Sequence, residues 1–332
     1  MTRDKEGDTT FSKLCYFKSG NVVNELLNTL STSKEITGGP NYYIYSTKNT
    51  LSDKAKILYL SFGEGSISKS AGNCTAKTIK ATKFHKYSGL HVLKLAVQIL
   101  RFKPNHVICA KRRWLHIIYL VSKIVGASFT ISVHTDISAK NKFDNAVIYH
   151  LLKLSDSVIC HGPYLRSQVN RITHNDSKII EYNASCKDLI GLSSSLPVNA
   201  DKIRNKKIIA FVGRVETRKG VHDLYEACKK LLRDNDDLVL CFAGGGQECA
   251  ALIERSRADG FDKQVIVLNQ LNRAQIANLL RQSPVTPTKS NFPEGRCMAA
   301  MEALAMGVPV IVPDFGPFPF LVKNGVKALS IN

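Results

Sequence analysis

The stretch KKIIAFVGRVETRKGVHDLYEACKKLL, residues 206–232, runs from an apolar segment through a loop of glycine and cations into a segment with helical spacing. The apolar residues at 208–212 predict a buried strand. After Gly220, apolar residues recur every three or four positions, which predicts an amphipathic helix. A strand, a glycine-containing turn and a helix in this order are the repeating unit of a parallel α/β sheet.

The same unit recurs along the rest of the chain. Apolar runs, each followed by a helical pattern or a turn, occur at 41–46, 55–62, 106–111, 128–134, 156–162 and 178–184, and again at 207–214, 238–246, 264–270, 284–288, 308–314 and 327–331. A polar stretch at 191–206 separates the two series and predicts a linker. We therefore expect an α/β protein with two doubly wound, Rossmann-like domains, residues 1–190 and 207–332, facing each other across a cleft.

The charge is high and unevenly distributed. The chain has 46 Lys and Arg against 27 Asp and Glu, a formal net charge of +19. Residues 65–135 contain no acidic residue at all. Such a surface suits nucleic acid, an anionic membrane or a phosphorylated substrate, and composition alone does not choose among them.

Cysteine usage and the N-terminus indicate a cytoplasmic protein. The nine cysteines are scattered without a C-x-x-C pair, so neither a disulfide framework nor a zinc site is predicted. Residues 1–13 include acidic residues and no apolar run follows them, unlike a signal peptide. The most apolar long stretch, 114–133, is interrupted by polar residues and predicts a helix followed by a buried strand rather than a membrane span.

Two groups of residues carry the predicted chemistry. Gly213 and Arg214 follow the strand at 208–212, and Lys219 lies five residues after Arg214, immediately before a helix. A planar guanidinium and an ammonium at the carboxyl end of a strand, beside a helix N-terminus, suit the binding of a diphosphate. Two ordinary surface cations in a solvated loop are the alternative interpretation.

The second group lies around a predicted helix at 298–306. Gly295, Arg296 and Cys297 precede that helix, whose first N–H groups form an anion site. Glu302 lies inside the helix among alanines, where a carboxylate can accept hydrogen bonds from sugar or ribose hydroxyls.

These motifs together resemble the retaining glycosyltransferases of family 4, which have the GT-B fold. The resemblance is carried by GRVETRKG at 213–220, by Glu294 and Glu302 at the spacing Glu-x7-Glu, and by EALAMGVPVIVPDFG at 302–316. It is strong over residues 206–332. Before them it rests on strand order, on SVHTD at 132–136 and on SDSVICHGPYLRSQV at 155–169.

The resemblance implies a role for each matching residue. Arg214 and Lys219 would hold the donor diphosphate, with Gly213, Gly295, Arg296 and Cys297 around it. Glu302 would bind the ribose, and Glu294 the sugar hydroxyls near the reacting carbon. His134 matches a histidine that contacts the donor sugar, with an ordinary packed or surface histidine as the alternative. Gly20 would let the backbone of the first domain approach the phosphates.

The sequence also departs from the family pattern. Arg296-Cys297 replaces the usual Phe-Gly, and Phe320 stands near the position of an expected acidic residue. The sequence given ends at Asn332, before the helices that usually cross back to the first domain. The chain is therefore either a fragment or a protein with weakened closure.

We expect a retaining, metal-independent glycosyltransferase without a cofactor. It would move a sugar from a nucleoside diphosphate sugar to a saccharide or lipid-linked acceptor, in synthesis of surface polysaccharide or lipopolysaccharide. The basic first domain would bind the acceptor, peripherally at the cytoplasmic face of the inner membrane. A non-catalytic partner subunit, a sugar-nucleotide epimerase and a nucleic-acid-binding protein remain alternatives. No nucleic-acid-binding motif accompanies the charge, so we expect no nucleic-acid partner.

Overall fold

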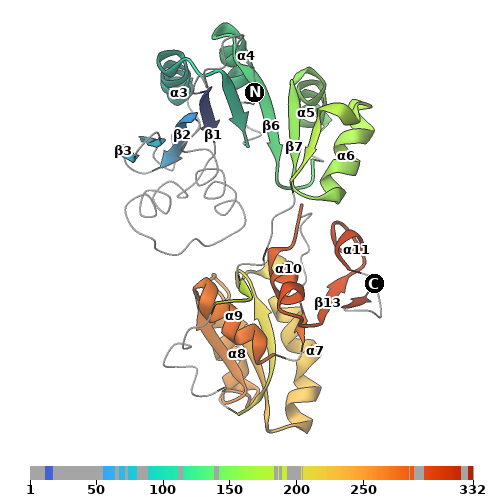
Figure 1. The fold of residues 1–332 in the computed structure, drawn as a ribbon. Helices are drawn as coiled ribbons and strands as arrows, with labels where there is room; N and C mark the ends of the chain where they lie inside the picture. Colours follow the sequence, from blue (N-terminus) through green and yellow to red (C-terminus); the bar gives the residue numbers. More distant parts are fainter. Residues whose placement is uncertain are drawn as a thin grey trace. The chain divides into compact units, whose positions relative to one another are not determined.

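The computed structural model divides the chain into two compact units, residues 1–183 and 184–332 (Figure 1). Each unit is described by itself. The structure describes residues 12–17, 55–63, 67–71, 74–80, 89–110, 115–137, 142–182, 186, 189–192, 203, 205–283, 285–287, 295–322 and 328–331.

The first unit is built on an eight-stranded sheet in the order β3-β4-β2-β1-β5-β6-β7-β8. Its strands are β1 (Ser12–Phe17), β2 (Ala55–Gly63), β3 (Ile67–Ala71), β4 (Cys74–Lys80), β5 (His106–Cys109), β6 (Ser128–Val133), β7 (Ser157–Cys160) and β8 (Ile179–Glu181). All neighbours run parallel except β3 and β4, which are antiparallel. The predicted parallel sheet is confirmed, whereas the strand expected at 41–46 lies outside the described residues.

The β3–β4 hairpin is absent from the strand pattern deduced from sequence. Its strands, ISKSA and CTAKTIK, mix a few apolar residues with lysine, serine and threonine, so they lack the continuous apolar run of a buried strand. The available signal was the Gly-Asn pair at 72–73 between them, which is typical of a tight hairpin.

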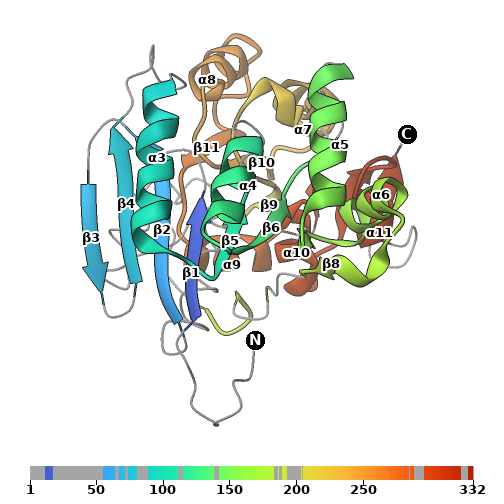
Figure 2. The same ribbon diagram turned by 90° about the horizontal axis from the view of Figure 1, so that it is seen from above.

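The helices of the first unit are α3 (Gly89–Phe102), α4 (Leu115–Ile124), α5 (Lys142–Leu154) and α6 (Pro163–Thr173). Figure 2 shows α3 and α4 lying over the same face of the sheet. On α3, Val92, Leu95 and Ile99 are buried, while Leu93 and Leu100 are 60% and 39% exposed. The helix therefore packs on the sheet and also presents leucines outward.

The predicted helix and strand in the apolar stretch 114–133 are confirmed as α4 and β6. Over the described part of the chain, none of the helices has the length and apolar character that crossing a bilayer requires.

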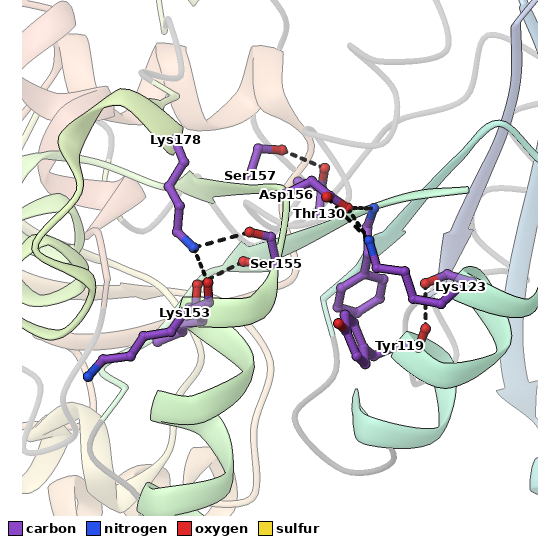
Figure 3. Close-up of polar contacts among 11 residues, drawn as sticks. Tyr119, Lys123, Thr130, Lys153, Ser155, Asp156, Ser157 and Lys178 are labelled. Carbon is purple, nitrogen blue, oxygen red and sulfur yellow. Dashed lines mark hydrogen bonds and ion pairs between the residues drawn. The ribbon is translucent and has the colours of Figure 1, made fainter. Parts of the chain in front are cut away.

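A polar network holds the amino ends of β6 and β7 together (Figure 3). The Asp156 carboxylate accepts a 2.7 Å hydrogen bond from the Phe129 N–H and a 2.9 Å bond from Lys123 Nζ. Thr130 Oγ1 and Ser157 Oγ lie 2.7 Å apart. These contacts fix the register of the two strands from the edge opposite to their carboxyl ends.

The second unit contains two three-stranded parallel sheets, β11-β10-β9 and β12-β13-β14. A parallel bridge between Ile209 and Val285 links them. The strands are β9 (Lys207–Val212), β10 (Leu238–Ala243), β11 (Val265–Asn269), β12 (Thr286–Pro287), β13 (Val310–Pro313) and β14 (Ala328–Ile331). The helices are α7 (Val221–Asp234), α8 (Cys249–Ala258), α9 (Arg273–Arg281), α10 (Met298–Ala305) and α11 (Phe318–Leu321). Every strand expected in this half of the chain is present.

Candidate active site

The cation loop, residues 213–220, joins β9 to α7 at the carboxyl end of the sheet. Its start is fixed by a 3.0 Å hydrogen bond from the Gly213 N–H to the Ala243 carbonyl. Its end is a short 3₁₀ helix, Thr217–Lys219, closed by Gly220 with a φ of 65°. Glycine adopts that left-handed conformation without strain, so the loop turns directly into α7.

Glu216 holds two arginines of this loop. Its Oε1 lies 2.9 Å from Arg214 Nη1, and its Oε2 lies 2.5 Å from Arg218 Nε. The Arg214 side chain is 60% exposed, so its guanidinium remains accessible to a ligand. Arg218 did not figure among the predicted site residues, because nothing in the sequence distinguishes it from a surface cation.

Lys219 is half-buried beside the start of α10. Burial is the strongest influence on its ammonium and lowers its pKa. The nearby Cys297 raises that pKa, whereas Arg214 and Arg218 lower it. The net pKa lies below the usual lysine value. Lys219 is thus near enough to Cys297 for an electrostatic interaction, which places the end of the cation loop near the start of α10.

The helix at this point is α10, which begins at Met298 as predicted. Cys297 precedes it in an extended conformation and is 5% exposed. Gly295 is buried and Arg296 half-buried. The first N–H groups of a helix carry partial positive charge, so α10 adds to the positive field around Lys219.

Glu302 lies on α10 and is 8% exposed. Its Oε1 lies 3.2 Å from Nη1 of Arg273, the first residue of α9. Asn272 and Gln275 form a capping box that fixes this helix start. The buried carboxylate is thus ionically paired, which removes much of its burial cost. Arg273 is a residue that sequence reasoning missed, although the cap signal N-R-A-Q placed it after β11.

A glycine-rich loop, residues 244–246, supports the cation loop from behind. The Val215 N–H donates to the Gly245 carbonyl, and the Glu248 N–H donates to the Val215 carbonyl, both at 3.1 Å. A Cβ on Gly246 would lie 2.0 Å from the Val215 oxygen, and one on Gly244 would lie 1.8 Å from the Gly213 oxygen. Only glycine allows this close approach of the two backbones.

A side-chain clamp joins the same two loops. The Glu248 carboxylate accepts a 2.7 Å hydrogen bond from Thr217 Oγ1 and lies 2.8 Å from His222 Nε2. The hydrogen bonds from His222 and Thr217 outweigh the opposing effect of burial and hold the pKa of Glu248 below its usual value. Glu248 therefore stays ionised and tied to the cation loop at neutral pH.

In the first unit, His134 follows β6 and is half-buried. Its ring stacks on that of His161, with centroids 3.8 Å apart. Asp136, two residues later, accepts hydrogen bonds from Tyr164 Oη and Gln168 Nε2, both at 2.6 Å. Burial first, and then the Asp136 carboxylate, raise the pKa of Tyr164 to about 12.

Comparison with known proteins covers the second unit best. Residues 197–332 match the family of glycosyl transferases group 1. This part of the chain is similar to group 1 glycosyl transferases. A glycogen synthase of Mycobacterium tuberculosis is 29% identical over 122 residues, which are 37% of this chain and 29% of that protein. A phosphatidyl-myo-inositol mannosyltransferase of Mycobacterium leprae is 31% identical over 133 residues, 40% of this chain and 35% of that protein.

These matches span about a third of the relatives' own length. Solved structures cover more of the chain. Sucrose-phosphate synthase of Thermosynechococcus elongatus has a TM-score of 0.75 and 14% identity, covering 96% of this chain and 86% of that one. Anabaena HepE in complex with UDP and glucose has a TM-score of 0.72 and 17% identity, covering 97% and 86%. The expected GT-B fold is thereby confirmed.

In the second unit, the structure brings the cation loop and the start of α10 near each other through Lys219 and Cys297, and it places Glu302 within α10, paired with Arg273. Two further predicted residues, Glu294 and Gly20, lie outside the described residues. Within the described ranges, no three His, Cys, Asp or Glu side chains form a group that could hold a metal ion.

Proposed function

We propose that this chain transfers a sugar from a nucleoside diphosphate sugar to an acceptor. The observation that carries the proposal is the cation loop after β9, which presents the exposed guanidinium of Arg214 and ends at Lys219, near Cys297 at the start of α10. Similarity to group 1 glycosyl transferases supports the same activity. HepE, solved in complex with UDP and glucose, supports a nucleotide-sugar donor.

In this proposal the cation loop and the α10 N-terminus stabilise the diphosphate as it leaves. Negative charge grows on that group when the bond to the sugar breaks, and fixed cations and N–H groups need no rearrangement to meet it. These groups supply the stabilisation that a metal would otherwise give, so we propose a metal-independent reaction without a cofactor.

Each remaining residue has a role in the same reaction. Glu302 binds the donor ribose, held in place by Arg273. Glu294 and His134 contact the donor sugar, and Gly20 lets the backbone approach the phosphates. We propose retention of configuration: the acceptor attacks from the face of the leaving diphosphate, the diphosphate oxygen takes the acceptor's proton, and Glu294 orients the sugar without bonding to it.

We propose that the acceptor is lipid-linked or a surface saccharide, and that the protein works at the cytoplasmic face of a membrane. On α4, Leu120 and Ile124 are 58% and 73% exposed, and α3 adds its outward leucines. They lie within the 65–135 window that lacks acidic residues. Exposed apolar side chains among cations suit an anionic lipid surface. The similarity to a mannosyltransferase named for phosphatidyl-myo-inositol supports this choice.

Thermal unfolding with UDP, GDP, ADP and CMP tests the donor site. We expect one nucleoside diphosphate to raise the Tm of the wild type, and Arg214→Ala to lose that shift. Arg257→Ala is a matched control, because Arg257 lies on α8 and belongs to no predicted site. No shift with any nucleotide, or an equal shift in Arg214→Ala, contradicts the proposed donor site.

Transfer to acceptor is tested separately, by incubating the protein with the selected donor and a membrane extract. Radiolabelled sugar should enter the lipid or polysaccharide fraction. Release of free sugar alone would favour the epimerase or hydrolase class.

Membrane binding is tested by co-sedimentation with lipid vesicles. We expect the protein to sediment with phosphatidylglycerol vesicles but not with phosphatidylcholine vesicles. The double variant Leu120→Ser, Ile124→Ser should bind the phosphatidylglycerol vesicles more weakly.

A further inference from the structure

Three residues occupy the same position after three neighbouring parallel strands of the first unit. Val133 of β6 pairs with Cys160 of β7, and Cys160 pairs with Glu181 of β8. One residue further, the same register places His134, His161 and Tyr182 in a row. Two main-chain hydrogen bonds extend the ladder to this row: His161 N–H to the Val133 carbonyl at 3.2 Å, and Tyr182 N–H to the Cys160 carbonyl at 2.8 Å.

The side chains of the row contact one another. The imidazoles of His134 and His161 stack at 3.8 Å with an angle of 27° between their planes, and the Tyr182 ring lies 5.2 Å from His161. His161 is 9% exposed, so it is the buried member of the pair. A buried imidazole held by the ladder and stacked on its neighbour limits the rotation of that neighbour.

The hydroxyl of Ser132 links the two imidazoles. Ser132 Oγ lies 3.1 Å from Nε2 of His134 and 3.1 Å from Nε2 of His161. A hydroxyl has a single proton to donate, so it cannot donate to both nitrogens. When it donates to one Nε2, the other Nε2 must carry its own proton and donate to Oγ. The two histidines therefore cannot both present an unprotonated Nε2 to Ser132, so the tautomer of one limits that of the other.

We propose that His161 is a positioning residue that fixes the ring plane and the tautomer of His134 through the stack and the shared Ser132 hydroxyl. The inference rests on the proposed function, in which His134 contacts the donor sugar. An imidazole that meets a sugar hydroxyl must present a defined donor or acceptor, and the hydrogen bond at the opposite ring nitrogen sets which one it presents. His161 supplies that control without touching the substrate.

Nitrogen-15 NMR of histidine-labelled protein tests the proposal without any substrate. We expect His134 to show a single neutral tautomer in the wild type and a mixture of tautomers in His161→Phe and in Ser132→Ala. His161→Gln, which can still hydrogen-bond Ser132, should restore the wild-type pattern. His150→Phe is the control, because His150 is exposed on α5. An unchanged His134 tautomer in both His161→Phe and Ser132→Ala overturns the inference. If His161→Phe fails to fold, Ser132→Ala alone decides.

Kinetics provide a second test, in which binding and turnover are separated. We expect His161→Phe to lower kcat about 10- to 100-fold while KM for the donor changes about twofold or less, because misorientation of a reacting group affects turnover more than binding. A rise in KM with unchanged kcat contradicts positioning. If the wild type transfers no sugar, the proposed function fails, and the NMR experiment still decides the role of His161.

Discussion

Gly246→Ala should disrupt the cation loop without changing any of its side chains. The added Cβ would lie 2.0 Å from the Val215 oxygen and 2.5 Å from its carbon. Ordinary van der Waals contact begins at about 3.4 Å, so the two backbones must separate by more than an ångström. That movement strains or breaks the 3.1 Å hydrogen bonds from Val215 to Gly245 and from Glu248 to Val215.

The expected cost follows from these changes. Overpacking costs about 1–3 kcal/mol, and each weakened hydrogen bond contributes up to about 1 kcal/mol. We therefore expect Gly246→Ala to lower the free energy of unfolding by about 3 kcal/mol. For a unit of this size, that loss lowers Tm by about 6–12 °C. Nucleotide affinity should also fall about tenfold or more, because Arg214 and Lys219 move with the loop.

Gly245→Ala is the matched control. It lies one residue away, and a Cβ there meets nothing within 4 Å. Urea unfolding followed by circular dichroism, together with nucleotide titration, should separate the two variants clearly. Equal unfolding midpoints and equal nucleotide affinities for Gly246→Ala and Gly245→Ala would refute the argument that close backbone contact shapes the site.

Three further outcomes are expected. Glu302→Gln should weaken binding of the ribonucleotide about tenfold and reduce the preference of the protein for it over the 2′-deoxy analogue. Arg273→Gln should reduce the same preference by a smaller factor. Calorimetry with both nucleotides checks this, and an unchanged preference contradicts the ribose assignment. Lys219→Ala should abolish the rise in Tm given by the nucleotide, while Lys219→Arg should retain part of it, because the charge of this side chain matters more than its shape. A full rise in Tm in Lys219→Ala would show that Lys219 does not bind the nucleotide. Asp156→Asn should flatten the acid side of the stability curve. Burial raises the pKa of Asp156, but the hydrogen bonds from Phe129 and Lys123 lower it by more, so the folded pKa lies below the unfolded value near 3.9. The stabilisation by Asp156 is therefore present above the unfolded pKa and is lost as pH falls through the folded pKa. That contribution is under about 1 kcal/mol because the Lys123 pair is exposed, and identical wild-type and variant curves between pH 5 and 3 would contradict it.

Local patterns predicted the elements well. The strand, cation loop and helix at 207–234 and the helix at 298–305 appear where the sequence indicates, because their signals lie within a few neighbouring residues. The β3–β4 hairpin was missed since its strands are mainly polar and lack a continuous apolar run. The order of the strands could not be derived from periodicity at all.

The contacts within the site were less predictable. That Arg273 pairs with Glu302, that the glycines at 244–246 support Val215, and that His161 stacks on His134 depend on which strands become neighbours. Each involves residues far apart in the sequence or contributed by different strands. The sequence carried only a faint indication of the last contact: SVH, VICH and IIEY each end with a ring-bearing residue.

Glu216 has a consequence for ligand selection. Because its single negative charge is shared between Arg214 and Arg218, an incoming anion must compete with an internal carboxylate whose effective concentration is high and constant. A singly charged anion gains little from that exchange. In the proposed donor site, a diphosphate would engage the arginine, Lys219 and the helix start together, and would displace the carboxylate where chloride or acetate would not. The proposed donor site would therefore discriminate among anions by their charge.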